Sequence, residues 1–184
     1  ERSLAPGFQL PHVHAIQAAC NVDLYAGDAA AAASRLEGAW PELERFGILR
    51  IQLVRVELQL LRARIALADT TRPVDDRGKL ARGLAEAVIK EDSPWAVGTA
   101  LAVRASAQAM RGELDAAHGA LVASEELLAA AEMRGMLQVV RLRRAQLEGG
   151  PGGGARAAAA RDALADLGAR EPERVAALLV PWDA

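Results

Sequence analysis

Cysteine, aromatic residues and an excess of either charge are all scarce in this chain. Its single cysteine, Cys20, can neither form an internal disulfide nor build a cysteine metal site, which favours a reducing compartment. Aromatic residues make up only 3% of the 184 residues, whereas alanine, leucine and valine abound. Sheets usually need aromatic and β-branched residues, so this composition favours closely packed helices. We therefore expect an all-α fold in which Cys20 is a small core residue.

The charge balance and the apolar runs argue against two classes of partner, although they leave room for a local charged patch. The formal net charge is −2, so no strong field draws the chain toward nucleic acid or an anionic membrane surface. No uninterrupted apolar run reaches about 18 residues, and no signal-peptide pattern opens the sequence. We expect a soluble, cytoplasmic protein with no nucleic-acid partner and no membrane partner.

Turn residues divide the chain into segments of helical length and predict about eight or nine helices. The breaks lie at Gly27-Asp28, 69–76, Asp92-Ser93-Pro94, Gly112-Glu113, Gly135 and 149–154. We expect one domain over residues 1–184, built of antiparallel helix pairs and a terminal helix. The pairs are expected near 10–26/28–46, 48–68/76–91, 94–111/113–132 and 136–148/155–168, and the terminal helix near 172–180.

Prolines predict several helix boundaries. Ser93 is expected to cap a helix that begins at Pro94, because a proline nitrogen has no hydrogen to leave unsatisfied. Glu171-Pro172 is expected to open the last short helix in the same way. Pro41 falls inside the second segment and is expected to kink or split its helix after Trp40.

The segment 48–68 combines strand-like alternation with helical length. About twenty residues without a turn residue are too many for an ordinary strand, so we expect a helix. Its apolar side chains then form two stripes on roughly opposite faces. One stripe is Leu49, Leu53, Val56, Leu60, Ala63 and Leu67, and the other is Ile51, Val54, Leu58, Leu61, Ile65 and Ala68. Such a helix is packed from both sides, as inner helices of a stack are.

Two stretches repeat small and apolar residues at identical spacing. They are Gly27-Asp28 followed by Ala32, Leu36 and Ala39, and Gly112-Glu113 followed by Ala117, Leu121 and Ser124. Both resemble the second half of a tetratricopeptide repeat (TPR), in which small residues let paired helices approach each other. The full tryptophan, tyrosine and proline pattern of that repeat is absent. We therefore expect a TPR-like solenoid of antiparallel helix pairs.

Three longer stretches, at 39–68, 93–117 and 160–181, resemble the C-terminal helical region of large myxobacterial serine/threonine protein kinases. Those kinases often carry an ATPase module between the kinase domain and the repeats. The family's tail has a helix, a glycine and a Pro-x-Arg helix ending in Ala-Ala-Leu-Leu. The corresponding residues here are Gly168, Pro172, Arg174 and 176–179. The resemblance implies an intracellular regulatory segment behind a signalling enzyme, and the non-methionine first residue, Glu1, suggests a fragment of a longer protein.

No motif for catalysis, a cofactor or a metal is found in the sequence. The glycine-rich loop, strand lysine, His-Arg-Asp loop and Asp-Phe-Gly site of kinases are missing. The glycine cluster 149–154 lacks the Lys-Ser/Thr that grips phosphates, so we expect a flexible surface linker. His12 and His14 point to different sides of a helix, and His118 stands alone. Asp75-Asp76 falls short of a calcium loop, and the second aspartate is expected to cap the following helix.

The three tryptophans are candidates for packing or for partner contact. Trp40 and Trp95, at helix ends, are expected to fill the space between helix layers. Trp182 follows the last helix and is expected to be either a partly exposed clasp or a frayed end.

We expect a non-catalytic protein-interaction or regulatory module, and the resemblance implies the C-terminal segment of a bacterial serine/threonine kinase or a related ATPase-coupled signalling protein. One alternative is a free-standing TPR-like adaptor or scaffold. A helical enzyme domain ranks last, because no nucleophile–base pair or paired carboxylates are recognisable. The partner is expected to be a protein or peptide, including other domains of the parent protein.

The expected binding groove is a polar stripe on the first helix of each pair. Glutamine and arginine offer forked donors suited to carboxylates and backbone carbonyls of a peptide. The other interpretation is a merely solvated face. The stripe consists of His14, Gln17 and Asn21; Gln52, Arg55, Gln59 and Arg62; Arg104, Gln108 and Arg111; and Gln138 and Arg141.

Overall fold

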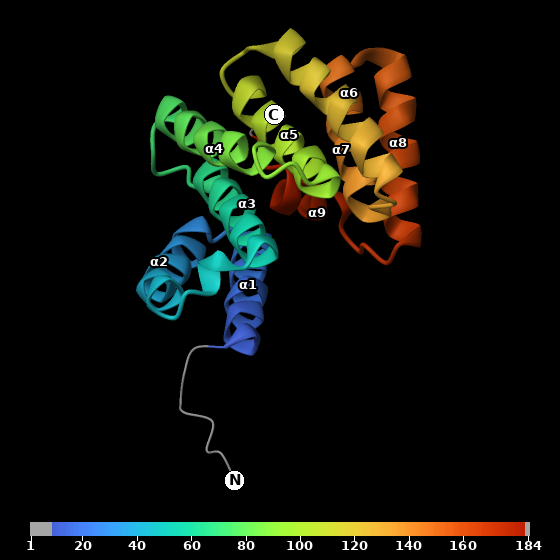
Figure 1. Ribbon diagram of the computed structural model, residues 1–184. Coiled ribbons are helices and arrows are strands. Elements are labelled where there is room, and N and C mark those ends of the chain that lie inside the picture. Colours follow the sequence, from blue (N-terminus) through green and yellow to red (C-terminus); the bar gives the residue numbers. More distant parts are fainter. Residues whose placement is uncertain (1–8, 183–184) are drawn as a thin grey trace.

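Short turns join consecutive helices that run antiparallel to one another (Figure 1). The computed structural model describes residues 9–182, and within them it contains nine α-helices, one 3₁₀-helix and no strand. The helices are α1 (Leu10–Tyr25), α2 (Ala29–Arg45), η1 (Ile48–Arg50), α3 (Gln52–Ala68), α4 (Val74–Ile89), α5 (Pro94–Ala109), α6 (Leu114–Ala130), α7 (Arg134–Glu148), α8 (Gly150–Asp166) and α9 (Pro172–Leu179). The expected all-α class is confirmed. None of these helices has the length and apolar character needed to cross a membrane.

The starts of α3 and α4 differ from the expected ones, and an expected break in α2 is absent. Residues 48–50 form the separate η1 after Gly47, whose φ is +66°, so α3 begins only at Gln52. Helix α4 begins at Val74 after Pro73, which places Asp76 within the first turn and not at the cap. Helix α2 continues through Pro41 to Arg45, so the proline does not split it after Trp40.

The two proline-opened helices start where expected. Pro94 is the first residue of α5 and Pro172 the first residue of α9. The Ser93 side chain makes no capping hydrogen bond, however. The Ser93 carbonyl instead accepts a hydrogen bond from Val97 N at 2.8 Å, so the proline and the backbone alone define this helix start.

The glycine cluster is not a flexible linker, because it forms the first turn and a half of α8. Gly149 and Gly150 have φ of +61° and +64°, which glycine adopts without strain, and they turn the chain from α7 into α8. Gly153 is buried against the end of α7: a Cβ there would lie 2.7 Å from the carbonyl oxygen of Ala145. The absence of side chains thus allows α7 and α8 to approach closely.

Helix α3 is packed on two faces, as its two apolar stripes predict. Val56, Leu60, Ala63 and Leu67 join a cluster with residues of α4 and α5. The opposite stripe packs against α1 and α2, and its buried members are Val54, Leu58, Leu61 and Ile65. Three stripe members depart from the pattern. Ile51 and Leu53, at the start of the helix, are 43% and 54% exposed, and Leu49 lies in η1 and packs against the cluster of the opposite stripe.

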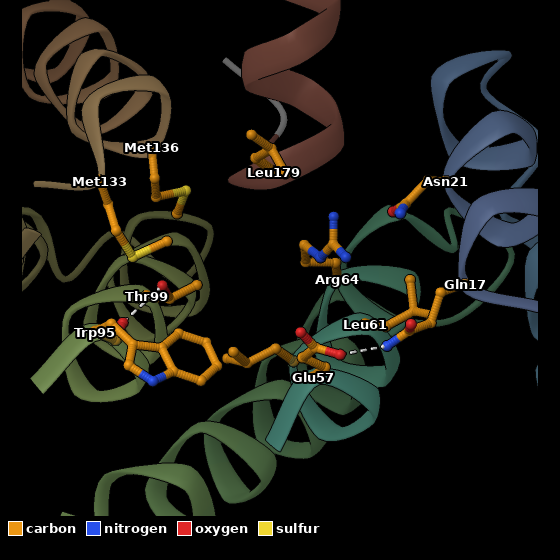
Figure 2. A pocket seen from close by; sticks show the side chains of 11 residues that line it. Gln17, Asn21, Glu57, Leu61, Arg64, Trp95, Thr99, Met133, Met136 and Leu179 are labelled. Carbon is orange, nitrogen blue, oxygen red and sulfur yellow. Dashed lines mark hydrogen bonds between the residues drawn. The ribbon is translucent and has the colours of Figure 1, made fainter. Parts of the chain in front are cut away.

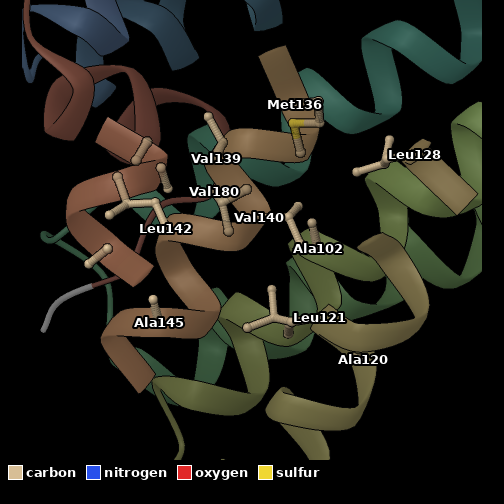
Figure 3. Close-up of a cluster of buried hydrophobic side chains, with 14 of the residues drawn as sticks. Ala102, Ala120, Leu121, Leu128, Met136, Val139, Val140, Leu142, Ala145 and Val180 are labelled. Carbon is tan, nitrogen blue, oxygen red and sulfur yellow. The ribbon is translucent and has the colours of Figure 1, made fainter. Parts of the chain in front are cut away.

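The third apolar cluster lies between α5, α6, α7, α8 and α9 (Figure 3). Its α6 members include Ala117 and Leu121, which the sequence repeat matches to the buried Ala32 and Leu36 of α2. The repeated residues therefore mark the face that α2 and α6, the second helices of their pairs, bury against the neighbouring helices. Ser124 of α6 also donates a hydrogen bond to the Gly98 carbonyl of α5 at 2.7 Å.

The C-terminal helix α9 turns back to lie between α1 and α7 (Figure 1). Two arginines hold the carbonyls at its C-terminal end. Arg143 Nε donates to Val180 O at 2.9 Å, and Arg64 Nη1 donates to Leu178 O at 3.4 Å. The Arg143 guanidinium also lies over the Trp182 ring, 5.1 Å from its centroid. Trp182 is therefore a partly buried clasp at the end of α9.

Candidate functional site

A cavity of about 350 Å³ lies where α1, α3, α5 and α9 meet the start of α7 (Figure 2). The first helix of every pair contributes to its wall. Its volume is within the range of roughly 300–1,000 Å³ that is usual for small-molecule sites. The arrangement arises because α9, packed between α1 and α7, covers the space that the four first helices surround.

One wall of the cavity is polar and comes from α1 and α3. Gln17 Nε2 donates a hydrogen bond to Glu57 Oε2 at 3.0 Å and ties the two helices together. Asn21 Oδ1 is buried and accepts no hydrogen bond from the described residues. A buried acceptor without a donor costs free energy, so Asn21 is poised to receive an N–H group.

Arg64 supplies the positive charge of this wall. Its one hydrogen bond to a described residue is the long contact with Leu178 O, and no carboxylate of residues 9–182 pairs with it. Burial lowers the pKa of Arg64 to about 10. The group stays charged at neutral pH, and a partly buried guanidinium without a carboxylate partner attracts an anion.

The wall across the cavity is apolar. Met133 and Met136, at the start of α7, face Arg64 and Asn21 from the other side (Figure 2). Trp95, from the first turn of α5, lies beside them, and Leu179 comes from α9. Methionine side chains are flexible and polarisable, so this wall can adapt to an apolar group of varied shape.

A wider, more open groove lies at the mouth of the cavity. It shares Glu57, Trp95 and Met133 with the cavity and continues over Leu53, Pro94, Ala130 and Ala131. Its volume is about 720 Å³. Leu53 lines this groove, and for this reason it is exposed and not buried as its apolar stripe predicts. The groove and the cavity share Glu57, Trp95 and Met133 and form one continuous lining.

The structure does not bring the predicted polar stripe together into one groove. Gln17 and Asn21 line the cavity, whereas His14 is exposed away from it. Gln52 and Arg55 are engaged with Glu91 at the end of α4: the Arg55 Nε and Nη2 atoms each lie 2.8 Å from a Glu91 oxygen. This pair ties α3 to α4 and holds the pKa of Glu91 below its usual value.

The remaining stripe residues lie on other surfaces. Arg62 lies over the Trp40 ring at 4.6 Å, in a small hollow between α2 and α4. Arg141 pairs with Glu125 at 2.7 Å. The Gln59 Oε1 and Arg104 Nε atoms are buried without a hydrogen bond to the described residues, and Gln138 is half-buried. Gln108 and Arg111 line a shallow hollow on the α4 side.

The sequence pattern misses the charged residues that face the cavity. On α3 the two apolar stripes leave a wide gap, which holds Arg55, Gln59 and Arg62, and a narrow gap, which holds Glu57 and Arg64. The wide gap was expected to line a binding groove, whereas the residues of the narrow gap line the cavity. The signal that marks it is the pair of opposite charges seven residues apart within an otherwise apolar helix surface.

The histidines and acidic residues offer no further site. His118 Nε2 lies 3.1 Å from Glu148, which also contacts Arg144 and Arg156, so this cluster cross-links α6, α7 and α8. Within the part of the chain that the structure describes, no three histidine, cysteine or acidic side chains are placed to hold a metal ion. Cys20 is fully buried, and burial raises the pKa of its thiol.

Comparisons with protein-family models, with curated proteins and with solved structures found no match. The resemblance to the helical region of bacterial kinases therefore stays a prediction.

Proposed function

We propose that this chain is a non-catalytic, TPR-like interaction module whose partner is a protein or peptide that presents apolar side chains. The observation that carries the proposal is the exposed groove of Leu53, Pro94, Trp95 and Met133. Exposed apolar surface of this kind is typical of protein-interaction sites. The first helices of the second and third pairs build it together with the turn between α6 and α7, as helical stacks often build their binding surfaces.

The resemblance stated above adds the context. It supports a cytoplasmic regulatory segment at the C-terminus of a bacterial serine/threonine kinase or a related ATPase-coupled signalling protein, with other domains of that protein as the first partners to test. A free-standing adaptor would use the same groove. The coding sequence upstream of Glu1 separates these two alternatives: a kinase domain supports the first and a start codon supports the second.

The groove is tested by selecting displayed peptides against the chain and by measuring its binding to the parent protein's other domains. Leu53→Asp should weaken binding at least tenfold without a loss of fold, because Leu53 is 54% exposed. Leu167→Asp is the matched control, since Leu167 is 53% exposed and lies outside the groove, at the end of α8. Binding that survives Leu53→Asp but is lost when Arg55, Arg62 and Arg104 are reversed to glutamate would favour the polar stripe.

A further inference from the structure

The cavity behind the groove has its own chemistry, which the docking of a protein partner does not explain. Arg64 presents a partly buried positive charge to the cavity, with no carboxylate partner in residues 9–182. Asn21 presents a buried acceptor that receives no hydrogen bond from the described residues. Both lie on the inner wall and neither lines the outer groove. We propose that the cavity binds a small organic acid with one carboxylate, an N–H donor and a compact apolar body, such as an N-acylated apolar amino acid.

The charges of the wall select the ligand's anionic group. A single guanidinium matches a monoanionic carboxylate, to which arginine can donate two parallel hydrogen bonds. A phosphate would bring up to two negative charges beside Glu57, whose carboxylate shares the cavity. The balance of one cation and one anion therefore excludes a multiply charged ligand and favours a single carboxylate.

The hydrogen-bond acceptors of the cavity wall favour a ligand that carries an N–H donor. Asn21 Oδ1 lacks a donor among residues 9–182, and Glu57 accepts a hydrogen bond from the Gln17 amide at 3.0 Å. An amide N–H next to the carboxylate carbon would satisfy one of these acceptors. A simple fatty acid lacks that donor and would leave Asn21 unpaired. The ligand is therefore an acylated amino acid and not a plain alkyl acid.

The apolar wall across the cavity favours a ligand whose remaining part is apolar. Met133, Met136, Trp95 and Leu179 form an apolar surface across from Arg64. A volume of about 350 Å³ is in the range usual for small-molecule sites. Because Trp95 and Met133 also line the outer groove, a ligand in the cavity would touch the surface that the partner meets.

The methionines provide a direct readout. The sequence has three of them, Met110, Met133 and Met136. Two line the cavity, whereas Met110 packs in the cluster around α3, α4 and α5. In a chain labelled with ¹³C at the methionine methyl groups, titration with N-acetyl-leucine should shift the Met133 and Met136 signals with saturation and leave the Met110 signal in place. Unchanged cavity methionines, or an equal shift of all three, would overturn the proposal.

Two ligand controls test the chemistry. N-acetyl-leucine amide keeps the shape and removes the charge, and octanoate keeps the charge and removes the N–H. Each should bind at least tenfold more weakly than N-acetyl-leucine. Equal affinity of the acid and its amide would refute the role of Arg64. A peptide ending in leucine that binds where N-acetyl-leucine does not would show that the site takes a protein terminus instead.

Protein variants complete the test. Arg64→Gln should abolish the preference for the acid over its amide, while Arg62→Gln, two residues earlier and outside the cavity, should leave it intact. Asn21→Asp gives a second test if Arg64→Gln lowers the melting temperature. A carboxylate at position 21 should repel the ligand's carboxylate and weaken the binding of N-acetyl-leucine at least tenfold. Leu53→Asp should not affect N-acetyl-leucine binding, so failure of the outer groove and failure of the cavity are distinguishable.

Discussion

Replacing Gly153 by alanine should cancel or reverse the stabilisation that such a change usually brings in a helix. Alanine is more stable than glycine inside a helix by about 1 kcal/mol, since glycine loses more backbone entropy on folding. At Gly153, however, the added Cβ would lie 2.7 Å from the Ala145 carbonyl oxygen, which is backbone and cannot rotate away. Overpacking of this kind costs about 1–3 kcal/mol, so Gly153→Ala should leave stability unchanged or lower it by up to about 2 kcal/mol.

The neighbouring glycine gives the matched control. Gly154 lies in the same helix, is exposed, and has no atom within 4 Å of an added Cβ. Gly154→Ala should therefore gain the full amount of about 1 kcal/mol. The two variants should differ by about 2 kcal/mol, which corresponds to roughly 4–8 °C in Tm for a chain of this length.

The assay is thermal and urea denaturation of both variants followed by circular dichroism at 222 nm. If Gly153→Ala and Gly154→Ala raised the Tm equally, α8 would not approach α7 as closely as described. The glycine cluster would then be a frayed segment, as the sequence alone suggests.

Three further outcomes are expected. Arg143→Met should lower the free energy of unfolding by about 2–3 kcal/mol in urea denaturation, because it leaves the Val180 carbonyl without its charged donor; an unchanged midpoint would contradict this. The Arg55 pair lowers the pKa of Glu91, so its stabilisation is present above the usual glutamate pKa of about 4.5 and is lost as the pH falls through the lower folded value; Glu91→Gln should flatten that part of the stability curve. The chain should neither hydrolyse ATP nor phosphorylate a generic substrate, and turnover lost on mutation of one of its own residues would refute this.

Most of the helices could be predicted from local features of the sequence, namely turn glycines and apolar periodicity. Gly27 and Gly112, with φ of +84° and +76°, end α1 and α5, and the helix pairs lie close to their predicted ranges. The two apolar stripes of α3 were readable because the period of a helix relates side chains only a few residues apart. The prediction of a flexible linker at 149–154 was wrong because a glycine-rich composition is also found where a helix packs closely against its neighbour.

The cavity could not be predicted, because it depends on where distant elements meet. The polar residues of α3 occupy two gaps, and only the packing of α1, α5 and α7 decides which gap faces inward. The position of α9 in the fold could not be predicted from the sequence either. Its sequence predicts a short helix, but the contact of Arg64 with Leu178 spans 114 positions along the chain.

That span has a consequence for how the chain folds. Contacts within each helix pair join residues that are near one another in sequence, and such contacts form quickly. The docking of α9 on α1 and α3 must close a loop over most of the chain, which costs more entropy and comes later. During synthesis, which proceeds from the N-terminus, the first pair is complete long before α9 exists. The inner side of α1 therefore stays uncovered until the last described helix has left the ribosome.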